Sequence, residues 1–577
     1  MNLFLDYQEK IFSSLRNLEK KKIIQIPSNI KSVTVELPPK NQKADISCNA
    51  AMVLAKANNS SPAGLAEILK KYLLLHFKEF KRVEIARPGF LNIYFHVTFW
   101  KKYLTKVIKL NLKYGSNKSP KKRYNIEFVS ANPTGPLHVG HCRGAIFGDA
   151  LSNLLIFNGN KVTKEYYVND YGEQIKNFVL SVYHRILEIK ENKPFPDDKE
   201  LYPGDYIIEI AKKIIRKKSI KNFDNFKKVY KKLSLESLKL SMQLIMHNLN
   251  ILGVKHNNFV YESKLVDNKM VLKIVKKLQR KKYIYKGKLE APKGEQTKDW
   301  RKRDQLLFKS TRFGDDIDRP LQKEDGTWTY FAGDMAYHSY KISRKFNVLI
   351  NILGADHTGY TKRIISATKA ISDNKVNLIC KVSQLVKLFK NGQPYKMSKR
   401  KGDYITVEDL IREVGKDSTR FMMLSRSNDV ELDFDFEKVT DKSKENPVFY
   451  VQYAYARINS IFRILKLNLK DEIKMGNNEF ALNLHEIEIL KKISEWPRCV
   501  EISSDKLEPH RIPFYLYDLV TLFHAYWNLG SVNKEFRFVS KNGSLNNLTN
   551  CETLHIKFTL LLEIAFVADI ILLVYPA

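Results

Sequence analysis

Hydrophobic and polar positions follow different patterns in three successive stretches of the chain. In the first, LAEILKKYLLLHF (65–77) repeats apolar residues at helical spacing, whereas LNIYFHV (91–97) is short, rich in β-forming residues and preceded by a Pro-Gly turn. In the second, short apolar segments such as VLINILGA (348–355) alternate with helical stretches, which is the pattern of βα units in a parallel sheet. In the third, HRIPFYLYDLVTLFHAYWN shows long helical periodicity and no strand signal.

These patterns predict a multidomain α/β protein. A small α+β N-terminal domain is expected over residues 1–112, and a Rossmann-type, doubly wound parallel-sheet domain over residues 113–440. Residues from about 185 to 280 are strongly basic and helical, and we expect them to form a helical insertion in the second domain. An all-α helical bundle is expected over residues 441–577.

The composition favours a folded protein and leaves the choice of partner open. With 44% hydrophobic and 28% charged residues among 577, the chain resembles ordinary globular proteins and not disordered, collagenous or coiled-coil ones. Lysine and arginine number 98 against 62 acidic residues, a net charge of +36. Such an excess attracts polyanions such as nucleic acid. A biased genome that favours lysine codons explains it equally well, so both interpretations stay open.

Three features bear on the compartment. The five cysteines are scattered without a C-x-x-C pair, which argues against a disulfide framework and a zinc ribbon. Asp6 and Glu9 interrupt the start of the chain, which therefore does not read as a secretory signal. The apolar stretch Phe558–Ala577 contains Glu563 and Asp569, so we expect a buried helix there and no membrane span. A cytoplasmic protein is expected.

The segment FVSANPTGPLHVGHCRGAIFGDALSNLL predicts an anion-binding turn. It reads as the end of a strand, a Pro/Gly turn, and His138 to His141 at the start of a helix. Exposed N–H groups and the helix dipole favour phosphate there, two imidazoles can donate to phosphate oxygens, and Gly140 leaves room for a flat ring. A nucleotide fits this description. A metal pair is the alternative, but no third ligand of suitable spacing is nearby, so no protein metal site is predicted.

A second segment, NGQPYKMSKRKGDYITVEDL, carries Lys396 and Lys399 on a loop before a helix. Mobile ammonium groups suit a triphosphate because they stabilise the charge that develops on departing pyrophosphate. A basic loop is also ordinary in a lysine-rich chain, so this motif alone decides nothing. His138 and Lys399 are 261 positions apart, a distance that a doubly wound sheet with an insertion closes at the carboxyl ends of its strands.

Neither segment is a Walker loop or a G-x-G-x-x-G fingerprint. HVGH after ANPTGPL, with KMSKR later in the chain, resembles the signature pair of class I aminoacyl-tRNA synthetases. YYVNDYGEQI, TYFAGDMAYH, ILGADHTGY and NPVFYVQYAYARI resemble the arginyl-tRNA synthetases specifically, and the similarity covers nearly the whole chain. Two departures are KMSKR in place of the commoner KMSKS and an end in Tyr-Pro-Ala, which leaves the role of the last residues open.

The resemblance implies an arginine–tRNA ligase. In such enzymes the carboxylate of L-arginine attacks the α-phosphorus of ATP, which gives arginyl-adenylate and pyrophosphate, and a terminal ribose hydroxyl of tRNA(Arg) then takes the arginyl group. No covalent enzyme intermediate is needed, so positioning and charge stabilisation carry the catalysis. ATP with Mg²⁺, L-arginine and tRNA(Arg) are the expected cofactors and partners, and a monomer is expected. The N-terminal domain is expected to touch the tRNA elbow and the C-terminal bundle to read the anticodon.

The resemblance also implies residue roles. The catalytic residues would be His138, His141, Lys396 and Lys399. The ATP-binding residues would be Pro136, His138, Gly140, His141, Asp356, His357, Lys396, Met397, Ser398 and Lys399. The arginine-binding residues would be Glu127, Ser130, Asn132, His141, Tyr330 and Asp334. The tRNA-binding residues would be Tyr450, Gln452, Tyr453 and Arg457.

Simpler interpretations stand beside these roles. Carboxylates suit a guanidinium, whose planar donors pair best with bidentate acceptors, but Glu127 and Asp334 are also free to pair with local lysines. The aromatic residues after Glu445 offer stacking surfaces for unpaired bases, yet at least half should be helix core. A small-molecule nucleotidyltransferase and an inactive tRNA-binding relic are the competing functions. The long helical domain argues against the first, and the intact signature residues argue against the second.

Overall fold

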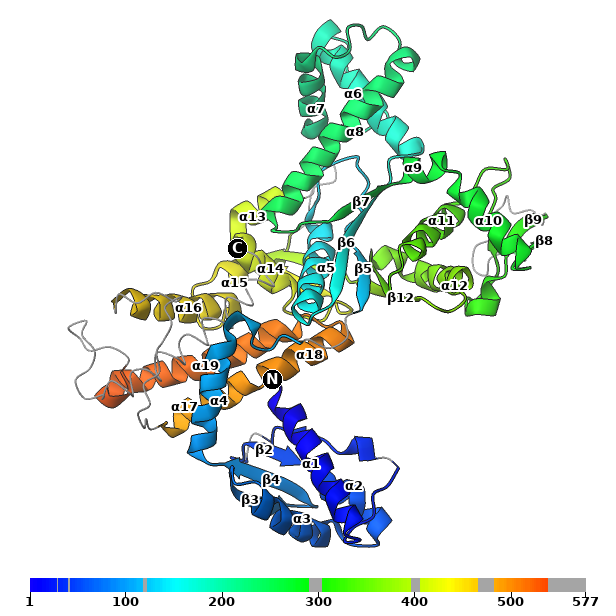
Figure 1. Cartoon of the computed structure of the whole chain (residues 1–577). Coiled ribbons are helices and arrows are strands. Elements are labelled where there is room, and N and C mark those ends of the chain that lie inside the picture. Colours follow the sequence, from blue (N-terminus) through cyan, green and yellow to red (C-terminus); the bar gives the residue numbers. More distant parts are fainter. Residues whose placement is uncertain are drawn as a thin grey trace. The chain divides into compact units, whose positions relative to one another are not determined.

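The computed structural model describes residues 1–28, 30–39, 42–117, 122–289, 304–395, 405–464 and 482–537. These residues fall into two compact units (Figure 1). One is built mainly from residues 118–442, and the other combines residues 1–117 with the described residues of the C-terminal helices. The expected terminal helix at 558–577 lies outside the described residues.

A five-stranded parallel sheet forms the centre of the first of these units, in the order β12–β11–β5–β6–β7. Its strands are β5 (Arg123–Glu127), β6 (Lys161–Val168), β7 (Asn258–Tyr261), β11 (Val348–Gly354) and β12 (Asn377–Ser383). The chain builds one side of the sheet from β5 through β7 and then returns with β11 on the other side of β5. This reversal between β5 and β11 is the topological switch point of a doubly wound sheet, where ligands bind at the carboxyl ends of the strands.

Helices bury the apolar residues of these strands. The signature turn leads into α5 (Val139–Phe157), and α11 (Tyr330–Ser343) and α12 (Thr361–Ser372) connect the later strands. Ala332, Met335 and Ala336 of α11 share one apolar cluster with Leu349 of β11 and Leu378 of β12. Short helices α9 (Glu262–Asp267) and α10 (Met270–Arg280) follow β7, and Ile274 and Leu278 of α10 belong to the same cluster.

Three long helices between β6 and β7 extend away from the sheet (Figure 1). They are α6 (Glu173–Glu191), α7 (Asp205–Lys217) and α8 (Phe226–Ile251), and they enclose a core of their own that includes Phe178, Ile207 and Leu233. The predicted insertion ran from about 185 to 280. The structure differs at its end, because β7 within that range pairs with β6 and is a strand of the central sheet.

Two smaller sheets complete this unit. The first contains β8 (Ile284–Gly287), β9 (Gln305–Phe308) and β10 (Arg319–Pro320). The second contains β13 (Val386–Lys390), β14 (Gln393–Pro394) and β15 (Leu432–Asp435), with α13 (Val407–Val414), α14 (Lys416–Met423) and α15 (Phe436–Thr440) alongside. Strand β14 leads toward the KMSKR segment, and residues 396–404 lie outside the described residues.

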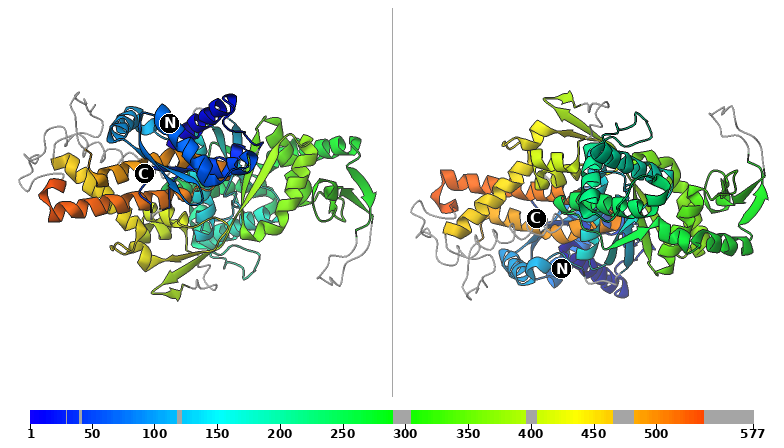
Figure 2. Two further views of the ribbon diagram at one scale, coloured as in Figure 1. Left: turned by 90° about the horizontal axis from the view of Figure 1, so that it is seen from below. Right: turned by 90° about the horizontal axis from the view of Figure 1, so that it is seen from above.

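The other unit joins an α+β part to a group of helices. Its antiparallel sheet has the order β1–β2–β4–β3. The strands are β1 (Val35–Glu36), β2 (Ile46–Cys48), β4 (Phe90–Phe95) and β3 (Phe80–Ala86). The helices of this part are α1 (Leu3–Lys20), α2 (Ala50–Ala55), α3 (Pro62–His76) and α4 (Val97–Leu110). The later helices, side by side in Figure 2, are α16 (Pro447–Ile464), α17 (Leu484–Ser494), α18 (Trp496–Lys506) and α19 (Arg511–Val532). The Trp496 indole donates to the Tyr114 carbonyl at 3.1 Å, which ties the two parts together.

The predicted fold class is confirmed: a doubly wound parallel sheet, a small α+β part and a bundle of helices are all present. Within the described ranges, no helix is both long and apolar enough to cross a membrane.

Candidate functional site

The site begins with a sharp turn at the end of β5. Val129 and Ser130 adopt positive φ angles of 69° and 42°, which is uncommon for residues with a Cβ and rare for a β-branched one. Helix α5 packs tightly behind the turn, since a Cβ on Gly148 would lie 2.3 Å from Cγ of Phe128. The turn therefore redirects the chain from the strand into the helix that carries the two histidines.

His138 and His141 form a neutral pair at the N-terminus of α5. His138 is the N-cap and accepts from the Gly140 amide through Nδ1 at 3.1 Å, while Nδ1 of His141 accepts from the His138 amide at 3.3 Å. Burial lowers the pKa of both rings, and burial together with His138 brings the pKa of His141 to about 4. Because each Nδ1 accepts a hydrogen bond, each neutral ring carries its hydrogen on Nε2 and can donate it to an anion.

The flank of the second signature segment reaches this helix start. The Val139 amide donates to the Ile405 carbonyl at 3.0 Å, and the Val407 amide donates to the Leu137 carbonyl at 3.0 Å. His138 and Thr406 thus form an antiparallel bridge. The four predicted residues Lys396, Met397, Ser398 and Lys399 lie outside the described residues. The described chain resumes at Ile405, in contact with the histidine motif.

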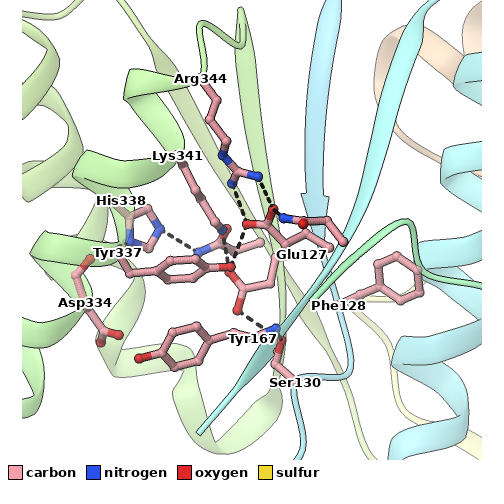
Figure 3. A network of polar contacts seen from close by, with 12 residues as sticks. Glu127, Phe128, Ser130, Tyr167, Asp334, Tyr337, His338, Lys341 and Arg344 are labelled. Atoms are coloured by element: carbon pink, nitrogen blue, oxygen red, sulfur yellow. Dashed lines mark hydrogen bonds and ion pairs between the residues drawn. The ribbon is translucent and has the colours of Figure 1, made fainter. Parts of the chain in front are cut away.

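Glu127 at the end of β5 is held by buried partners (Figure 3). Its Oε2 accepts from the ammonium of Lys341, whose side chain is fully buried, and its Oε1 accepts from the Ser130 hydroxyl at 3.1 Å. Lys341 also donates to Asn351 at 2.9 Å. The simpler interpretation, that Glu127 pairs with a lysine, therefore holds in this structure. Its carboxylate is fixed in direction next to the turn.

Asp334 and Glu262 are two carboxylates near it whose charges interact, and the group they form is called the acidic pocket below. Asp334 accepts a hydrogen bond from the Tyr360 hydroxyl, yet burial, with the charge of Glu127, raises its pKa to about 6. Burial and the charges of Asp334 and Asp170 raise the pKa of Glu262 to about 7. Carboxylates whose pKa values are raised by burial and by neighbouring negative charges favour the binding of a cation, which would relieve the repulsion.

The helix that carries Asp334 is anchored by a second buried acid. Glu165 of β6 accepts from the Tyr337 hydroxyl at 2.8 Å and from the Arg344 guanidinium at 2.6 and 2.8 Å. Burial alone would raise the pKa of Glu165, but Arg344 and Lys341 hold it near 2. His338, also on α11, contacts Asn351 at 2.9 Å. These contacts fix α11 against the sheet and with it the direction of Asp334.

Two of the pocket's residues were missing from the sequence analysis, Glu262 and Tyr360. Glu262 is the first residue of α9 and follows β7 directly, at the same edge of the sheet as Glu127. An acid placed after an apolar segment was the available signal, but NFVY is a short segment and lay within the predicted insertion. Tyr360 closes the ILGADHTGY motif, whose aspartate and histidine drew attention instead.

The remaining predicted residues lie around this edge. A cavity of about 390 Å³ separates the signature turn from the segment after α6 and is lined by Ala131, Asn132, Thr134, Gly135, Pro136, His138, His141, Tyr202, Pro203, Gly204 and Tyr206. Asn132 donates to Gln174 at 2.7 Å. Tyr330 is 77% exposed at the start of α11. Asp356 and His357, 3.4 Å apart, are exposed after β11, and the charge of Asp356 acts on His141.

The predicted tRNA-binding residues of α16 surround a buried histidine of α19. The Arg457 guanidinium donates to Nδ1 of His524 at 2.9 Å and to the Tyr453 hydroxyl at 2.8 Å, and lies 4.1 Å from the Tyr453 ring centre. Burial lowers the pKa of His524, whose Nε2 donates to the Tyr450 carbonyl at 3.0 Å. Gln452 is exposed and Tyr453 is 42% exposed, so both offer surface to a partner.

Metal ligands do not gather in the part of the chain that the structure describes: no three His, Cys, Asp or Glu side chains there are placed to hold an ion. Four cysteines in that part, Cys48, Cys142, Cys380 and Cys499, are free thiols.

Known proteins resemble this chain over nearly its whole length. The family described as "tRNA synthetases class I (R), catalytic domain" matches residues 103–462, "DALR anticodon binding domain" matches 451–545, and "Arginyl tRNA synthetase N terminal domain" matches 7–95. The chain is 54% identical to the arginine–tRNA ligase of Pelagibacter ubique and 43% identical to that of Wolbachia sp. subsp. Brugia malayi, each over 95% of both chains. The solved structure of Thermus thermophilus arginyl-tRNA synthetase, 17% identical, shares the fold with a TM-score of 0.67 over 99% of this chain and 98% of that one.

Proposed function

Because the chain belongs to the arginyl-tRNA synthetase family and joins arginine to tRNA at the expense of ATP, we propose that the edge of the sheet between β5 and β11 is where both steps occur. The arginine carboxylate attacks the α-phosphorus of ATP, the bond to pyrophosphate breaks, and a ribose hydroxyl of the tRNA then displaces AMP from the adenylate. The protein contributes positioning and charge, and no side chain needs to form a covalent bond.

The histidine pair is proposed to hold the ATP phosphates. Two neutral rings with their hydrogens on Nε2, placed at a helix N-terminus, supply donors and a positive dipole end without a full charge. Lys396 and Lys399 are proposed to stabilise the pyrophosphate as it leaves. Mg²⁺ is proposed to arrive bound to the phosphates of ATP and to neutralise part of their charge.

The acidic pocket is proposed to select arginine. Asp334 and Glu262 are acceptors from two different elements, and a planar guanidinium pairs with carboxylates through parallel hydrogen bonds. Glu127, Ser130 and Asn132 at the turn are proposed to orient the amino-acid end toward the phosphates. The observation that carries the proposal is this group of carboxylates with raised pKa values beside an anion-binding helix start.

The helical part is proposed to bind the anticodon region of tRNA(Arg). Gln452 and Tyr453 are exposed on α16, and Arg457 holds the Tyr453 ring by a hydrogen bond and a cation–π contact. An exposed, pre-oriented aromatic ring suits an unpaired base. The protein is proposed to act as a monomer in the cytoplasm, and the described cysteines, which are free thiols, suit such a reducing compartment.

Arginine-dependent exchange of labelled pyrophosphate into ATP tests the proposal. The reaction is run with and without tRNA, with lysine and glutamate as control amino acids. We expect exchange with arginine only. Exchange with lysine at a similar rate would refute the role of the acidic pocket, and tRNA binding without any exchange would favour the inactive relic.

A further inference from the structure

Arg143 is a buried cation directly beside the histidine pair. It lies on α5, two residues after His141, and is only 1% exposed. Burial lowers the pKa of its guanidinium to about 10, which leaves it charged at neutral pH. A buried charge requires strong partners. Among the described residues, its hydrogen-bond partners are three main-chain carbonyls, and the nearby charge of Asp429 raises its pKa.

The three carbonyls come from two loops that lie side by side next to α5, at a junction called the crossing below. Arg143 donates through one terminal nitrogen to Gln384 at 3.1 Å and to Val430 at 2.6 Å, and through the other to Ser427 at 2.8 Å. The loops are also tied to each other, because the Gln384 amide donates to the Asn428 carbonyl at 2.9 Å. The Arg143 guanidinium and this main-chain hydrogen bond therefore hold the two loops together.

This crossing is the base of the sheet from which the second signature segment departs. Gln384 lies between β12 and β13, and Val430 lies just before β15, the parallel neighbour of β13. Strand β13 turns back through β14, and the chain next appears in the described residues at Ile405, bonded to Val139. Arg143 fixes the departure of this segment on α5, and main-chain bonds fix its return to the same helix.

We propose that Arg143 is a positioning residue for adenylate formation. Its guanidinium fixes the base of β13 and β15 on the signature helix, and so sets where the chain leaves β14 at Pro394 relative to His138 and His141. The inference rests on the proposed roles of the histidines and of Lys399. Arg143 is not among the residues proposed to contact ATP or arginine, and it acts through the elements that carry those residues.

Arginine is required for a geometric reason. Its planar fork reaches three carbonyls in different directions, whereas a lysine ammonium is a single point that cannot span them. Arg143→Met keeps much of the length and apolar stem and removes all three donors. Arg143→Lys keeps the charge and is the milder variant, to be used where the methionine variant does not fold.

Arg420→Met is the matched control. Arg420 is fully buried, also packs against α5, and donates to Asp149 at 2.7 Å and to the Leu252 carbonyl at 2.8 Å. Neither of those residues belongs to the crossing. Asp149 keeps a second partner in Lys164 at 2.6 Å, so the control removes a comparable buried arginine without leaving the acid unpaired.

The first readout is pyrophosphate exchange at saturating tRNA, with Tm measured for each variant. We expect Arg143→Met to lower kcat by about 10- to 100-fold and to raise KM for ATP, because small misplacements of reacting groups have effects of that order. KM for arginine should stay near the wild-type value. A fall in kcat that the Arg420→Met control reproduces at an equal loss of Tm would overturn the proposal.

The second readout does not depend on activity. Amide hydrogen exchange should speed up in Arg143→Met over residues 384–394 and 405–407 and stay unchanged in α12. Unchanged exchange over those two segments overturns the proposal even if the rate falls. If Lys399→Ala proves fully active, the proposed role of that lysine fails, while hydrogen exchange still decides the role of Arg143.

A double-mutant cycle tests whether Arg143 and Lys399 serve the same function. If Arg143 acts through the second signature segment, Arg143→Met should lower kcat less than about 3-fold in a Lys399→Ala background, since the two substitutions would damage one function. Fully additive losses would show that Arg143 acts by another route.

Discussion

Arginine binding should weaken sharply as the pH falls from 8 to 6. Burial and the charges of Asp334 and Asp170 place the pKa of Glu262 at about 7. A carboxyl with a raised pKa takes up its proton as the pH falls, and a bound guanidinium requires the ionised form. From these values, the proton on Glu262 alone raises KM for arginine about 10-fold, or about 1.4 kcal/mol, between pH 8 and pH 6. Asp334, with a pKa of about 6, adds a factor of about 2.

The assay is the initial rate of pyrophosphate exchange at saturating tRNA and ATP, from which KM for arginine is obtained at several pH values. KM for ATP, measured in the same series, separates titration of the nucleotide from titration of the pocket. Glu262→Gln is the decisive variant. Losing one charge-assisted hydrogen bond should raise KM for arginine about 10- to 150-fold at pH 8, and most of the dependence on pH should disappear.

Two results would refute this reasoning. One is a KM for arginine that stays flat between pH 6 and pH 8. The other is a steep dependence that survives in Glu262→Gln. The sign of the linkage also gives an independent check on the empty enzyme. Because Glu262 binds its proton more tightly in the folded state than in the unfolded state, it destabilises the fold as the pH rises past its unfolded pKa, so Glu262→Gln should raise Tm at pH 8 and leave it nearly unchanged at pH 4.

Three further substitutions probe the other parts of the site. Lys399→Ala should lower the rate of pyrophosphate exchange about 100-fold and leave tRNA affinity in a filter-binding assay unchanged; an equal loss of both would argue against a role in the transition state. Tyr360→Phe removes the hydrogen bond that lowers the pKa of Asp334, so KM for arginine at pH 7 should rise about 2- to 10-fold and the acid limb should move to higher pH. Arg457→Met releases the Tyr453 ring, and tRNA affinity should fall about 10-fold with KM for arginine unaffected; an unchanged affinity would place these side chains outside the tRNA interface.

Local sequence signals predicted the parts of the site that depend on local chemistry. The Pro/Gly turn, the two histidines and the helix that they begin follow one another in the chain, and the structure has them in that order. Glu127 and Lys341 are far apart in the sequence, so no local pattern predicts their ion pair. Val129 adopts a left-handed conformation that its β-branched side chain disfavours, so propensity argues against the observed turn.

The missed strand shows how a short element escapes periodicity. NFVY has only four residues, follows a 26-residue helix and is followed by two more helices, so its neighbours set the pattern. Its membership in the sheet comes from pairing with β6, a tertiary contact. Glu262 was missed for the same reason. An acid stands out as a candidate ligand only when the residues before it are known to form a strand of the sheet.

The bridge between His138 and Thr406 also governs when the site comes into existence during synthesis. The histidine helix emerges early, but the partners of Leu137 and Val139 are made about 270 residues later, so the nascent chain carries one half of the proposed nucleotide site without the other for nearly half of translation. Strand β5 likewise has only β6 as a neighbour until β11 has been synthesised. A polypeptide released before residue 405 would hold both histidines and still lack the backbone that closes the site. Activation of arginine is thus expected only from chains that have been synthesised past Val407.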